Sequence, residues 1–203
     1  MQKREKIVDL IQSVQLDREV TVMGWIRSFR NDRFIALNDG STIKTLQVVI
    51  DQENEDFALL KRFTVGAAIK ATGRIIESQG KGQSVELVAE TLVVLGDCDA
   101  DKYPLQPKKH SLEFLRDIAH LRVRTNTFSA VFRIRHAVTF AIHKFFNDKG
   151  FYNVHSPIIT GSDAEGAGEM FQVTTMDMNS IPLEEDGKVD YKQDFFGKAT
   201  NLT

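Results

Sequence analysis

The chain has 203 residues and a formal net charge of −2, with 42% hydrophobic and 27% charged residues. This balance excludes a disordered or fibrous chain and predicts a globular protein of one or two domains. The apolar runs are too short to cross a bilayer, and the N-terminus lacks the apolar core of a signal peptide. The single cysteine, Cys98, excludes an intrachain disulfide and fits a reducing, cytoplasmic setting.

The small net charge hides an uneven distribution along the chain. Residues 102–144 carry 9 basic and 2 acidic side chains, whereas residues 145–203 carry 4 basic and 10 acidic ones. A basic middle segment is typical of a surface that binds a polyanion, but a solvated helix face has the same composition. Charge alone does not choose between these two interpretations.

The first 97 residues have the alternation and the β-forming residues of a strand-rich domain. A short amphipathic helix is predicted over residues 4–14, and a second helix over 53–63. Gly24 and Gly73 lie inside predicted strands and indicate bends or bulges. The predicted strands are residues 20–30, 34–37, 45–50, 67–76 and, as the fifth, 85–88 with 91–95.

Five strands with a helix between the third and the fourth is the order of an OB-fold, a small barrel that commonly binds single-stranded nucleic acid. Such binding needs an aromatic platform with polar groups beside it. Phe34 offers a stacking ring, Gln47 an amide edge and Arg27 a cation for phosphate or base. Barrel core is the ordinary alternative for Phe34, whereas Gln47 points to the face opposite its neighbours Leu46 and Val48.

A linker follows the strand-rich part. Residues 97–112 contain two prolines, Pro104 and Pro107, and have no apolar periodicity. A short helix is predicted over 112–121, with Arg122 and Arg124 directly after it.

A long helix is predicted over residues 127–147, where apolar side chains recur mostly at three- and four-residue steps. Gly150 ends it as the residue that adopts the left-handed conformation beyond a helix. The run 151–160 then predicts a strand, in which Pro157 indicates an edge or interface position.

The next stretch, Gly161 to Phe171, holds three glycines and the carboxylates Asp163, Glu165 and Glu169. By composition alone a solvated acidic turn is the better interpretation. A glycine-rich loop can also move and close its carboxylates over a cationic or amide-bearing ligand.

Taken in this order, these stretches resemble the class II aminoacyl-tRNA synthetases. The long helix, Gly150-Phe151 and Ser156-Pro157-Ile-Ile resemble motif 1, and residues 103–122 resemble the hinge of the class IIb subgroup. Glu165-Gly-Ala-Gly-Glu-Met-Phe171 and Phe195-Phe-Gly-Lys198 are similar to the asparaginyl form of this family. The resemblance covers nearly the whole chain.

The resemblance implies an α+β chain in three parts. Residues 1–97 form an OB-fold anticodon-binding domain and residues 98–124 a hinge. Residues 125–203 begin an antiparallel-sheet catalytic domain, with motif 1 and a mobile flipping loop. Motifs 2 and 3 do not occur before Thr203, so we expect an N-terminal fragment without catalytic residues of its own. A surface insertion with an exposed hairpin tip is predicted within residues 176–194.

The same resemblance implies the site residues. Glu165 is the ammonium-binding carboxylate of the flipping loop, and no residue is assigned to a metal. The implied residues are Arg27, Phe34 and Gln47 for the tRNA anticodon, Glu165, Ser162 and Glu169 for the amino acid, and Pro157 for the dimer interface.

For the full-length protein the resemblance implies an asparagine–tRNA ligase that uses ATP and Mg²⁺ to activate asparagine and transfers it to tRNA(Asn). It also implies a cytoplasmic homodimer, formed through motif 1, without a membrane partner. Two alternatives stay open: an aspartyl-tRNA synthetase of the non-discriminating type, and a stand-alone OB-fold nucleic-acid-binding protein.

Overall fold

The computed structural model describes residues 3–12, 15–50, 57–80, 82–162 and 169–203. The chain forms two compact units, Met1–Ala141 and Ile142–Thr203. The helices are α1 (Ile7–Gln12), α2 (Phe57–Leu60), α3 (Leu112–Asp117) and α4 (Asn126–Asp148), with 3₁₀ turns η2 (Arg122–Arg124) and η3 (Tyr191–Gln193). The strands are β1 (Glu19–Arg30), β2 (Phe34–Asn38), β3 (Leu46–Ile50), β4 (Ala68–Glu77), β5 (Val85–Gly96), β6 (Ile159–Thr160), β7 (Gln172–Val173) and β8 (Thr200–Leu202).

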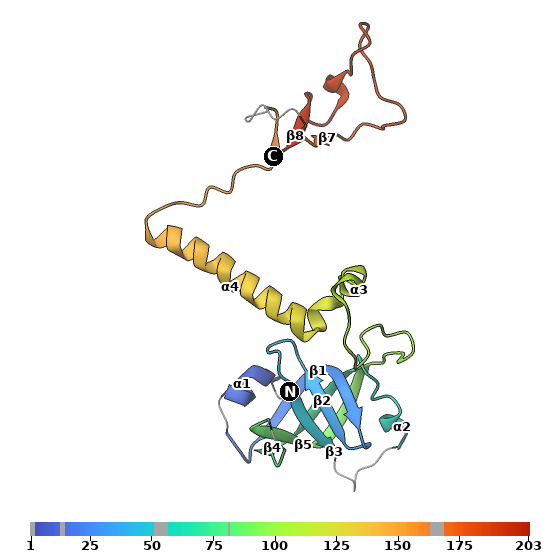
Figure 1. The fold of residues 1–203 in the computed structure, drawn as a ribbon, viewed down its shortest axis with the longest axis vertical. Coiled ribbons are helices and arrows are strands. Elements are labelled where there is room, and N and C mark those ends of the chain that lie inside the picture. Colours follow the sequence, from blue (N-terminus) through green and yellow to red (C-terminus); the bar gives the residue numbers. More distant parts are fainter. Residues whose placement is uncertain (1–2, 13–14, 51–56, 81, 163–168) are drawn as a thin grey trace. The chain divides into compact units, whose positions relative to one another are not determined.

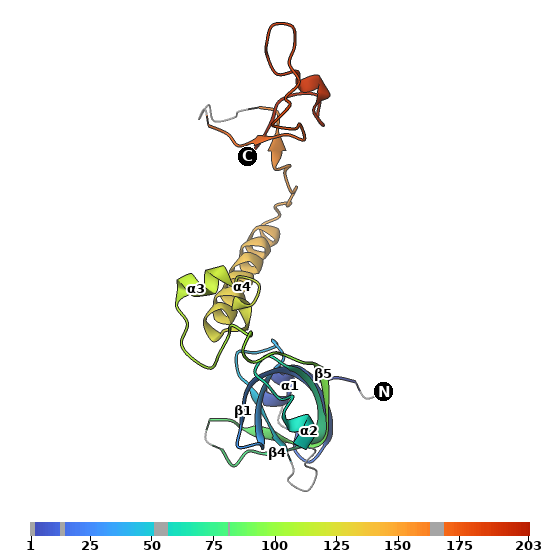
Figure 2. The same cartoon turned by 90° about the vertical axis from the view of Figure 1, so that its right-hand side faces the viewer.

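The first unit is built on a closed five-stranded barrel with the strand order β1-β2-β3-β5-β4 (Figures 1 and 2). The β3–β5 pair is parallel and the other pairs are antiparallel. The barrel confirms the predicted OB-fold. The two short stretches predicted for the fifth strand are one strand, β5, whose register shifts opposite Thr72 and Gly73. Of the predicted helix over 53–63 the structure has α2, and residues 53–56 lie outside the described residues.

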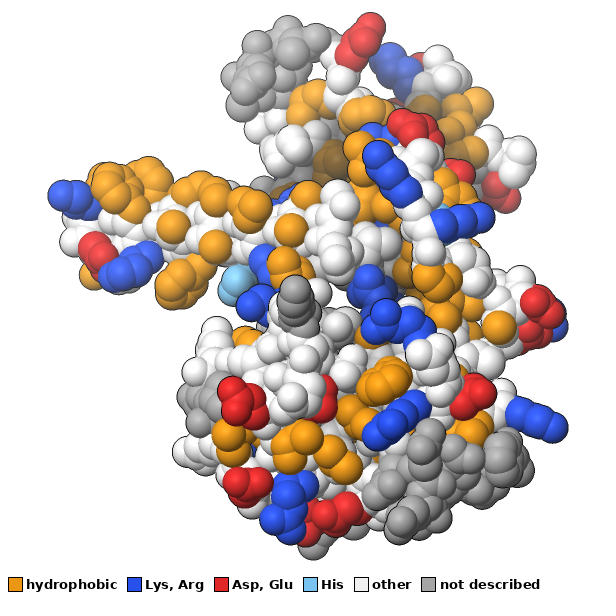
Figure 3. Space-filling view, turned by 60° about the horizontal axis from the view of Figure 1, so that its bottom comes forward, with side chains coloured by type: hydrophobic (Ala, Val, Ile, Leu, Met, Phe, Trp, Pro, Cys, Tyr) orange, Lys and Arg blue, Asp and Glu red, His pale blue; other side chains and the backbone are white. Residues whose placement is uncertain are grey.

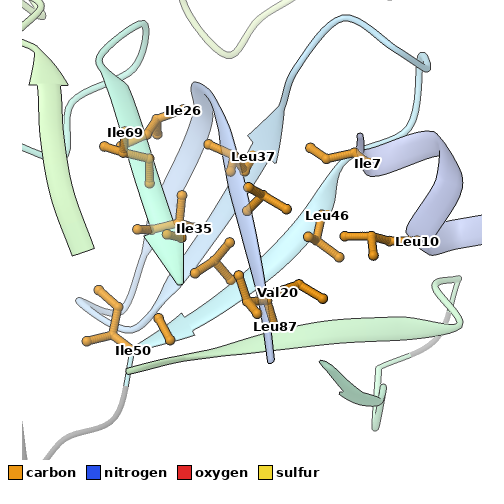
Figure 4. Close-up of a cluster of buried hydrophobic side chains, with 14 of the residues drawn as sticks. Ile7, Leu10, Val20, Ile26, Ile35, Leu37, Leu46, Ile50, Ile69 and Leu87 are labelled. Atoms are coloured by element: carbon orange, nitrogen blue, oxygen red, sulfur yellow. The ribbon is translucent and has the colours of Figure 1, made fainter. Parts of the chain in front are cut away.

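Alternate side chains of the strands fill the barrel. Ile35, Leu37 and Val48 are fully buried at 0% exposure, and the residues between them point outward. Ile7 and Leu10 of α1 join the same cluster and lie beside Leu46 (Figure 4). Each side chain of this size contributes about 1.5–3 kcal/mol when it is fully buried. The apolar alternation therefore fixes which side chains the barrel presents outside.

The predicted bulge at Gly73 is confirmed by the register shift and by the space around this glycine. A Cβ atom at Gly73 would lie 2.0 Å from the backbone oxygen of Val88. Only a residue without a side chain fits between the two strands at this position.

A hinge segment follows β5 inside the first unit. It leads to α3, where the Ser111 hydroxyl accepts a hydrogen bond from the Phe114 amide at 3.2 Å and so caps the helix. The predicted helix over 112–121 is shorter, because α3 ends at Asp117 and η2 follows after a turn.

The long predicted helix is confirmed as α4, and Gly150 ends it as predicted. Gly150 has a φ of +84°, and its amide bonds to the Asn147 carbonyl at 2.9 Å. The Phe151 amide reaches the Phe146 carbonyl at 3.1 Å, and the two rings meet at 5.5 Å. This is the Schellman arrangement, with its usual apolar contact.

Most of α4 is exposed among the described residues. From Val131 to Asp148 every side chain is exposed (Figure 3). The exposed apolar side chains include Val131, Phe132, Ile134, Val138, Phe140, Ile142, Phe145 and Phe146. No helix in the described ranges combines the length and the apolar character that a membrane span needs.

The second unit contains a small antiparallel sheet with the order β6-β8-β7. The strand predicted over 151–160 is wrong for most of its length, because only Ile159 and Thr160 pair, with β8. Pro157 cannot donate to a ladder, and His155 has a φ of +49°, which interrupts an extended strand. The segment Phe195–Lys198 lies in the turn before β8.

The hairpin tip predicted near residue 186 is confirmed. Leu183 and Val189 pair as an isolated bridge, and the Glu184 amide donates to the Lys188 carbonyl at 2.7 Å. The tip is exposed and lies in the same unit as the small sheet.

We predict that Gly73→Ala destabilises the barrel by about 1–3 kcal/mol, because the added methyl group forces β4 away from β5. Gly96→Ala in β5 is the matched control, since its Cβ would meet only the Ala68 side chain at 3.8 Å. Urea unfolding measures both free energies. Equal stability of the two variants would contradict the packing at the bulge.

Candidate nucleic-acid interface

The outer face of strands β1, β2 and β3 brings two predicted site residues together. Ala36 pairs with Gln47 across β2 and β3, and Phe34 precedes Ala36 by two residues on the same strand. Because cross-strand partners and residues two apart share a face, Phe34 and Gln47 both lie on the outside of the barrel. The aromatic ring and the amide are thus diagonal neighbours on one surface.

Phe34 is half-buried and is not part of the hydrophobic core, which sets the core interpretation aside. The guanidinium of Arg33 lies 5.6 Å from the centre of its ring. A partly open ring on a strand is the arrangement on which a nucleic-acid base stacks.

Gln47 is held by a carboxylate that the sequence did not reveal. Its Nε2 donates to Oε2 of Glu86 at 3.0 Å, and the same oxygen accepts from the Ser78 hydroxyl at 3.1 Å. Glu86 is 8% exposed and is the parallel-strand partner of Gln47. With Nε2 engaged, the Gln47 carbonyl oxygen keeps a free lone pair to accept from a base. The only signal in the sequence is an acidic residue inside an apolar strand.

Arg30 was also missed by the sequence interpretation. It is exposed and pairs directly with Phe34 across β1 and β2. Counting in steps of two along β1 from Arg30 gives Ser28, which faces Ala36 on the same outer surface. This alternation was visible in the sequence.

A cleft of about 1540 Å³ runs along this face and the hinge, within the first unit. The barrel and the hinge both contribute cations to its lining. These cations are Arg27, Arg30, Lys44, Lys108, Lys109 and Arg124. No Asp or Glu is found among the described residues that line it. Figure 3 shows Lys and Arg side chains gathered along the upper edge of the barrel. Cations that line a cleft without carboxylates attract polyanions and neutralise phosphates.

Arg27, the third predicted nucleic-acid contact of the barrel, is engaged by the hinge. Its guanidinium donates to the Arg124 carbonyl and to Oδ1 of Asn126, the latter at 3.3 Å. Burial lowers the pKa of Arg27 from its ordinary value, although the residue stays a cation. Its predicted contact with nucleic acid is neither shown nor contradicted by these bonds.

The predicted amino-acid-binding residues belong to the second unit, and Glu165 lies outside the described residues. Ser162 is exposed, and its amide donates to the Thr160 hydroxyl at 3.2 Å. Glu169 and Pro157 are exposed as well. A Cβ at Gly161 would lie 3.2 Å from Nζ of Lys198, so the glycine leaves room for this lysine.

A buried carboxylate organises the second unit. Asp194 is 7% exposed, and its Oδ1 accepts from the amide of Thr175 at 2.9 Å and from that of Phe195 at 2.8 Å. The Thr175 hydroxyl donates to the same oxygen at 3.0 Å. These donors, the Thr175 amide foremost, lower the pKa of Asp194 to about 2. Asp194 therefore joins the segment after β7 to the turn before β8.

Comparison with known proteins gives two family matches. The family described as OB-fold nucleic acid binding domain matches residues 20–95. The family described as tRNA synthetases class II (D, K and N) matches residues 111–183.

Curated relatives match nearly the whole chain. The asparagine–tRNA ligase of Cytophaga hutchinsonii is 56% identical over 99% of this chain, and that of Bacteroides fragilis strain YCH46 is 55% identical over 98%. The chain spans 44% and 43% of the length of these two relatives.

Solved structures share the fold. The asparaginyl-tRNA synthetase of Pyrococcus horikoshii, complexed with asparaginyl-adenylate, has a TM-score of 0.76 at 19% identity. This chain is covered completely and accounts for 43% of that one. A putative aspartyl-tRNA synthetase from Leishmania major has a TM-score of 0.73 at 15% identity, covering all of this chain and 38% of that one.

A nucleic-acid-binding barrel is thus followed, in the same chain, by a segment similar to class II tRNA synthetases. Over nearly its whole length the chain is 52–56% identical to asparagine–tRNA ligases, and it spans less than half the length of these relatives. The fold class expected from the resemblance, an OB barrel followed by the start of a class II domain, is confirmed.

We predict that the Thr175 amide signal titrates with a midpoint near pH 2 in NMR spectra. The pKa of Asp194 is lowered to about 2 from an ordinary value of 3.8, so its hydrogen bonds stabilise the second unit fully above about pH 4 and are lost as the pH falls through 2. Asp194→Asn is the control, because it keeps an acceptor but does not titrate. A midpoint near 3.8 would show that the donors do not hold the carboxylate.

Proposed function

We propose that this chain is the RNA-binding part of an asparagine–tRNA ligase and that the outer face of its barrel binds the anticodon of tRNA(Asn). The observation that carries this proposal is the juxtaposition of Phe34 and Gln47 on one face beside a basic cleft whose described lining has no carboxylate. Sequence similarity supports it, since the relatives at 55–56% identity carry the name asparagine–tRNA ligase.

Each group on the face has a role in this proposal. An anticodon base stacks on Phe34, and the Gln47 carbonyl oxygen accepts from the edge of a base while Glu86 holds the amide in place. Arg30 beside Phe34 and the lysines of the hinge neutralise phosphates of the same RNA. Phosphate contacts set the position of the RNA, and base contacts give the specificity.

The full-length protein would activate asparagine with ATP and transfer it to tRNA(Asn) in the cytoplasm. Ser162, Glu165 and Glu169 are proposed to bind the amino acid from the flipping loop, with Glu165 facing its ammonium group. Among the described residues, no three His, Cys, Asp or Glu side chains lie close enough together to hold a metal ion. ATP and Mg²⁺ are expectations from the family resemblance.

Asparagine is favoured over aspartate as the substrate by eight curated relatives at 50–56% identity, each of which carries the name asparagine–tRNA ligase. The solved aspartyl-tRNA synthetases from Leishmania major and Entamoeba histolytica, 15% and 18% identical, share the fold, as the asparaginyl structures do at 18–19%. The division into a domain over 1–97, a hinge over 98–124 and a catalytic segment over 125–203 is part of the same proposal. The two family matches, 20–95 and 111–183, support it.

A homodimer formed through α4 and the segment around Pro157 completes the proposal. The exposed apolar stripe of α4 includes Ile134, Val138 and Ile142, at four-residue spacing. A stripe of this kind in water is typical of a helix that packs against a partner. A second copy of the same chain is the proposed partner.

We predict that Phe34→Ala weakens binding of the tRNA(Asn) anticodon stem–loop by about 1–3 kcal/mol, because a stacked base loses its platform. Fluorescence titration of the chain with labelled stem–loop measures the change. Phe171→Ala is the control, since Phe171 is 80% exposed in the second unit. Unchanged affinity of a folded Phe34→Ala variant would disprove the base-stacking role.

We predict that Val138→Asp raises the dissociation constant of the dimer at least about tenfold, because a carboxylate is buried without a partner. Sedimentation equilibrium measures the constant. Thr139→Asp, at the next position of the helix and already polar, is expected to change it little. A chain that is monomeric at all concentrations, or equal effects of both substitutions, would refute the α4 interface.

A further inference from the structure

The side chain of Arg27 leaves the barrel at a bulge. Along β1, Ile26 pairs with Leu37 and Ser28 pairs with Ala36, so Arg27 has no partner of its own on β2. A bulge re-aims the side chain of the extra residue and bends the strand. Arg27 is therefore out of register with the surface that presents Phe34 and Gln47.

The re-aimed guanidinium bonds to the chain that leads into α4. It donates to the backbone carbonyl of Arg124 and to the side-chain oxygen of Asn126, 3.3 Å away. Hydrogen bonds from a charged donor are stronger than neutral ones, and a half-buried guanidinium is costly without them. These two bonds connect Arg27 to residues that follow it by 97 and by 99 positions in the sequence.

Arg124, whose carbonyl accepts the bond from Arg27, makes two further contacts through its own side chain. The Arg124 guanidinium lies 4.3 Å from the centre of the Trp25 ring, and it donates to the Tyr103 hydroxyl at 3.4 Å. The Tyr103 ring in turn lies against Gly66, where a Cβ would come within 3.0 Å of it. The barrel strand β1, the hinge and the last residue of η2 thus form one connected set of contacts.

A second arginine makes the reverse connection, from α4 to the barrel. Arg133 donates to the backbone carbonyl of Gly40 at 2.5 Å. The loop around Gly40 is held by side-chain hydrogen bonds, because Asn38 donates to the Lys44 carbonyl at 2.7 Å and accepts from the Gly40 amide at 3.0 Å. Two arginines therefore connect the start of α4 to the barrel. Arg27 of the barrel donates to the Arg124 carbonyl just before α4, and Arg133 of α4 donates to the Gly40 carbonyl of the barrel.

We propose that Arg27 is a positioning residue: with Arg133 it latches the start of α4 onto the barrel and so holds the two walls of the basic cleft at a fixed separation. Arg27, Trp25, Tyr103, Arg124 and Asn126 all line that cleft. Fixing both walls before RNA arrives removes an ordering cost from binding. The inference rests on the proposed function, because it gives the cleft an RNA ligand.

The first test compares two RNAs that differ in reach. A short single-stranded RNA with the anticodon sequence touches the barrel alone, whereas whole tRNA(Asn) also meets the hinge. Arg27→Ala is expected to weaken whole-tRNA binding about tenfold, equivalent to about 1.4 kcal/mol, and to change short-RNA binding less than about twofold. Asn126→Ala, which removes an acceptor without a change in charge, is expected to act in the same direction but less strongly. An equal loss for both RNAs would overturn the latch.

Salt dependence separates positioning from direct phosphate contact. A side chain that neutralises one phosphate contributes about 0.7–0.9 to the slope of log binding constant against log salt concentration. Arg27→Ala is expected to leave this slope unchanged while affinity falls. Arg74→Ala is the control for net charge, because Arg74 is exposed on β4 and does not line the cleft. A slope shallower by about 0.7–0.9 for Arg27→Ala would make Arg27 a direct RNA contact instead.

A measurement without RNA tests the latch by itself. In a Cys98→Ser background, spin labels at Thr91→Cys on the barrel and Arg135→Cys on α4, both exposed positions, report one distance distribution. A narrow distribution is expected for the parent chain and a broad one for Arg27→Ala with Arg133→Ala. If the parent is already broad, or the double variant stays narrow, no latch exists. If the parent binds neither RNA but keeps the narrow distribution, the proposed function fails and the latch stands.

Discussion

The closed barrel and the register of its strands are the constraint on which the rest of the structure depends. Ile35, Leu37 and Val48 must point inward to fill the barrel, and this forces Phe34 and Gln47 to the outside. A slip of one residue would bury the amide and expose the core. The same burial that stabilises the fold therefore sets the geometry of the candidate RNA-binding face.

The hinge extends that face into a cleft. Lys108, Lys109 and Arg124 of the hinge line the cleft together with barrel residues, while no Asp or Glu is found among its described lining. Part of the basic middle of the sequence thus lines the cleft, whereas its cations on α4, Arg133, Arg135 and Lys144, lie on an exposed helix. Arg27 and Arg133 connect the two walls through backbone carbonyls, so the shape of the cleft depends on side chains from both.

Local patterns in the sequence were sufficient for the barrel, for α4 and its glycine end, and for two residues of the face. Contacts between distant residues were not predictable in this way. Glu86 meets Gln47 only because β3 and β5 run in parallel, and Arg27 leaves its strand only because of a bulge at one register step. The strand expected over 151–160 failed for a related reason: its alternation was suitable, but only its last two residues find a partner strand among the described residues. A strand depends on its neighbour as much as on its own residues.

The central proposal is that this chain belongs to an enzyme that charges tRNA(Asn) with asparagine, and that residues of the barrel recognise this tRNA. The most direct measurement is aminoacylation by the protein encoded by the full reading frame, with radiolabelled asparagine or aspartate and with tRNA(Asn) or tRNA(Asp). The account predicts that asparagine is attached to tRNA(Asn) and that aspartate is attached to neither tRNA. Attachment of aspartate to both tRNAs would contradict it and establish a non-discriminating aspartyl enzyme.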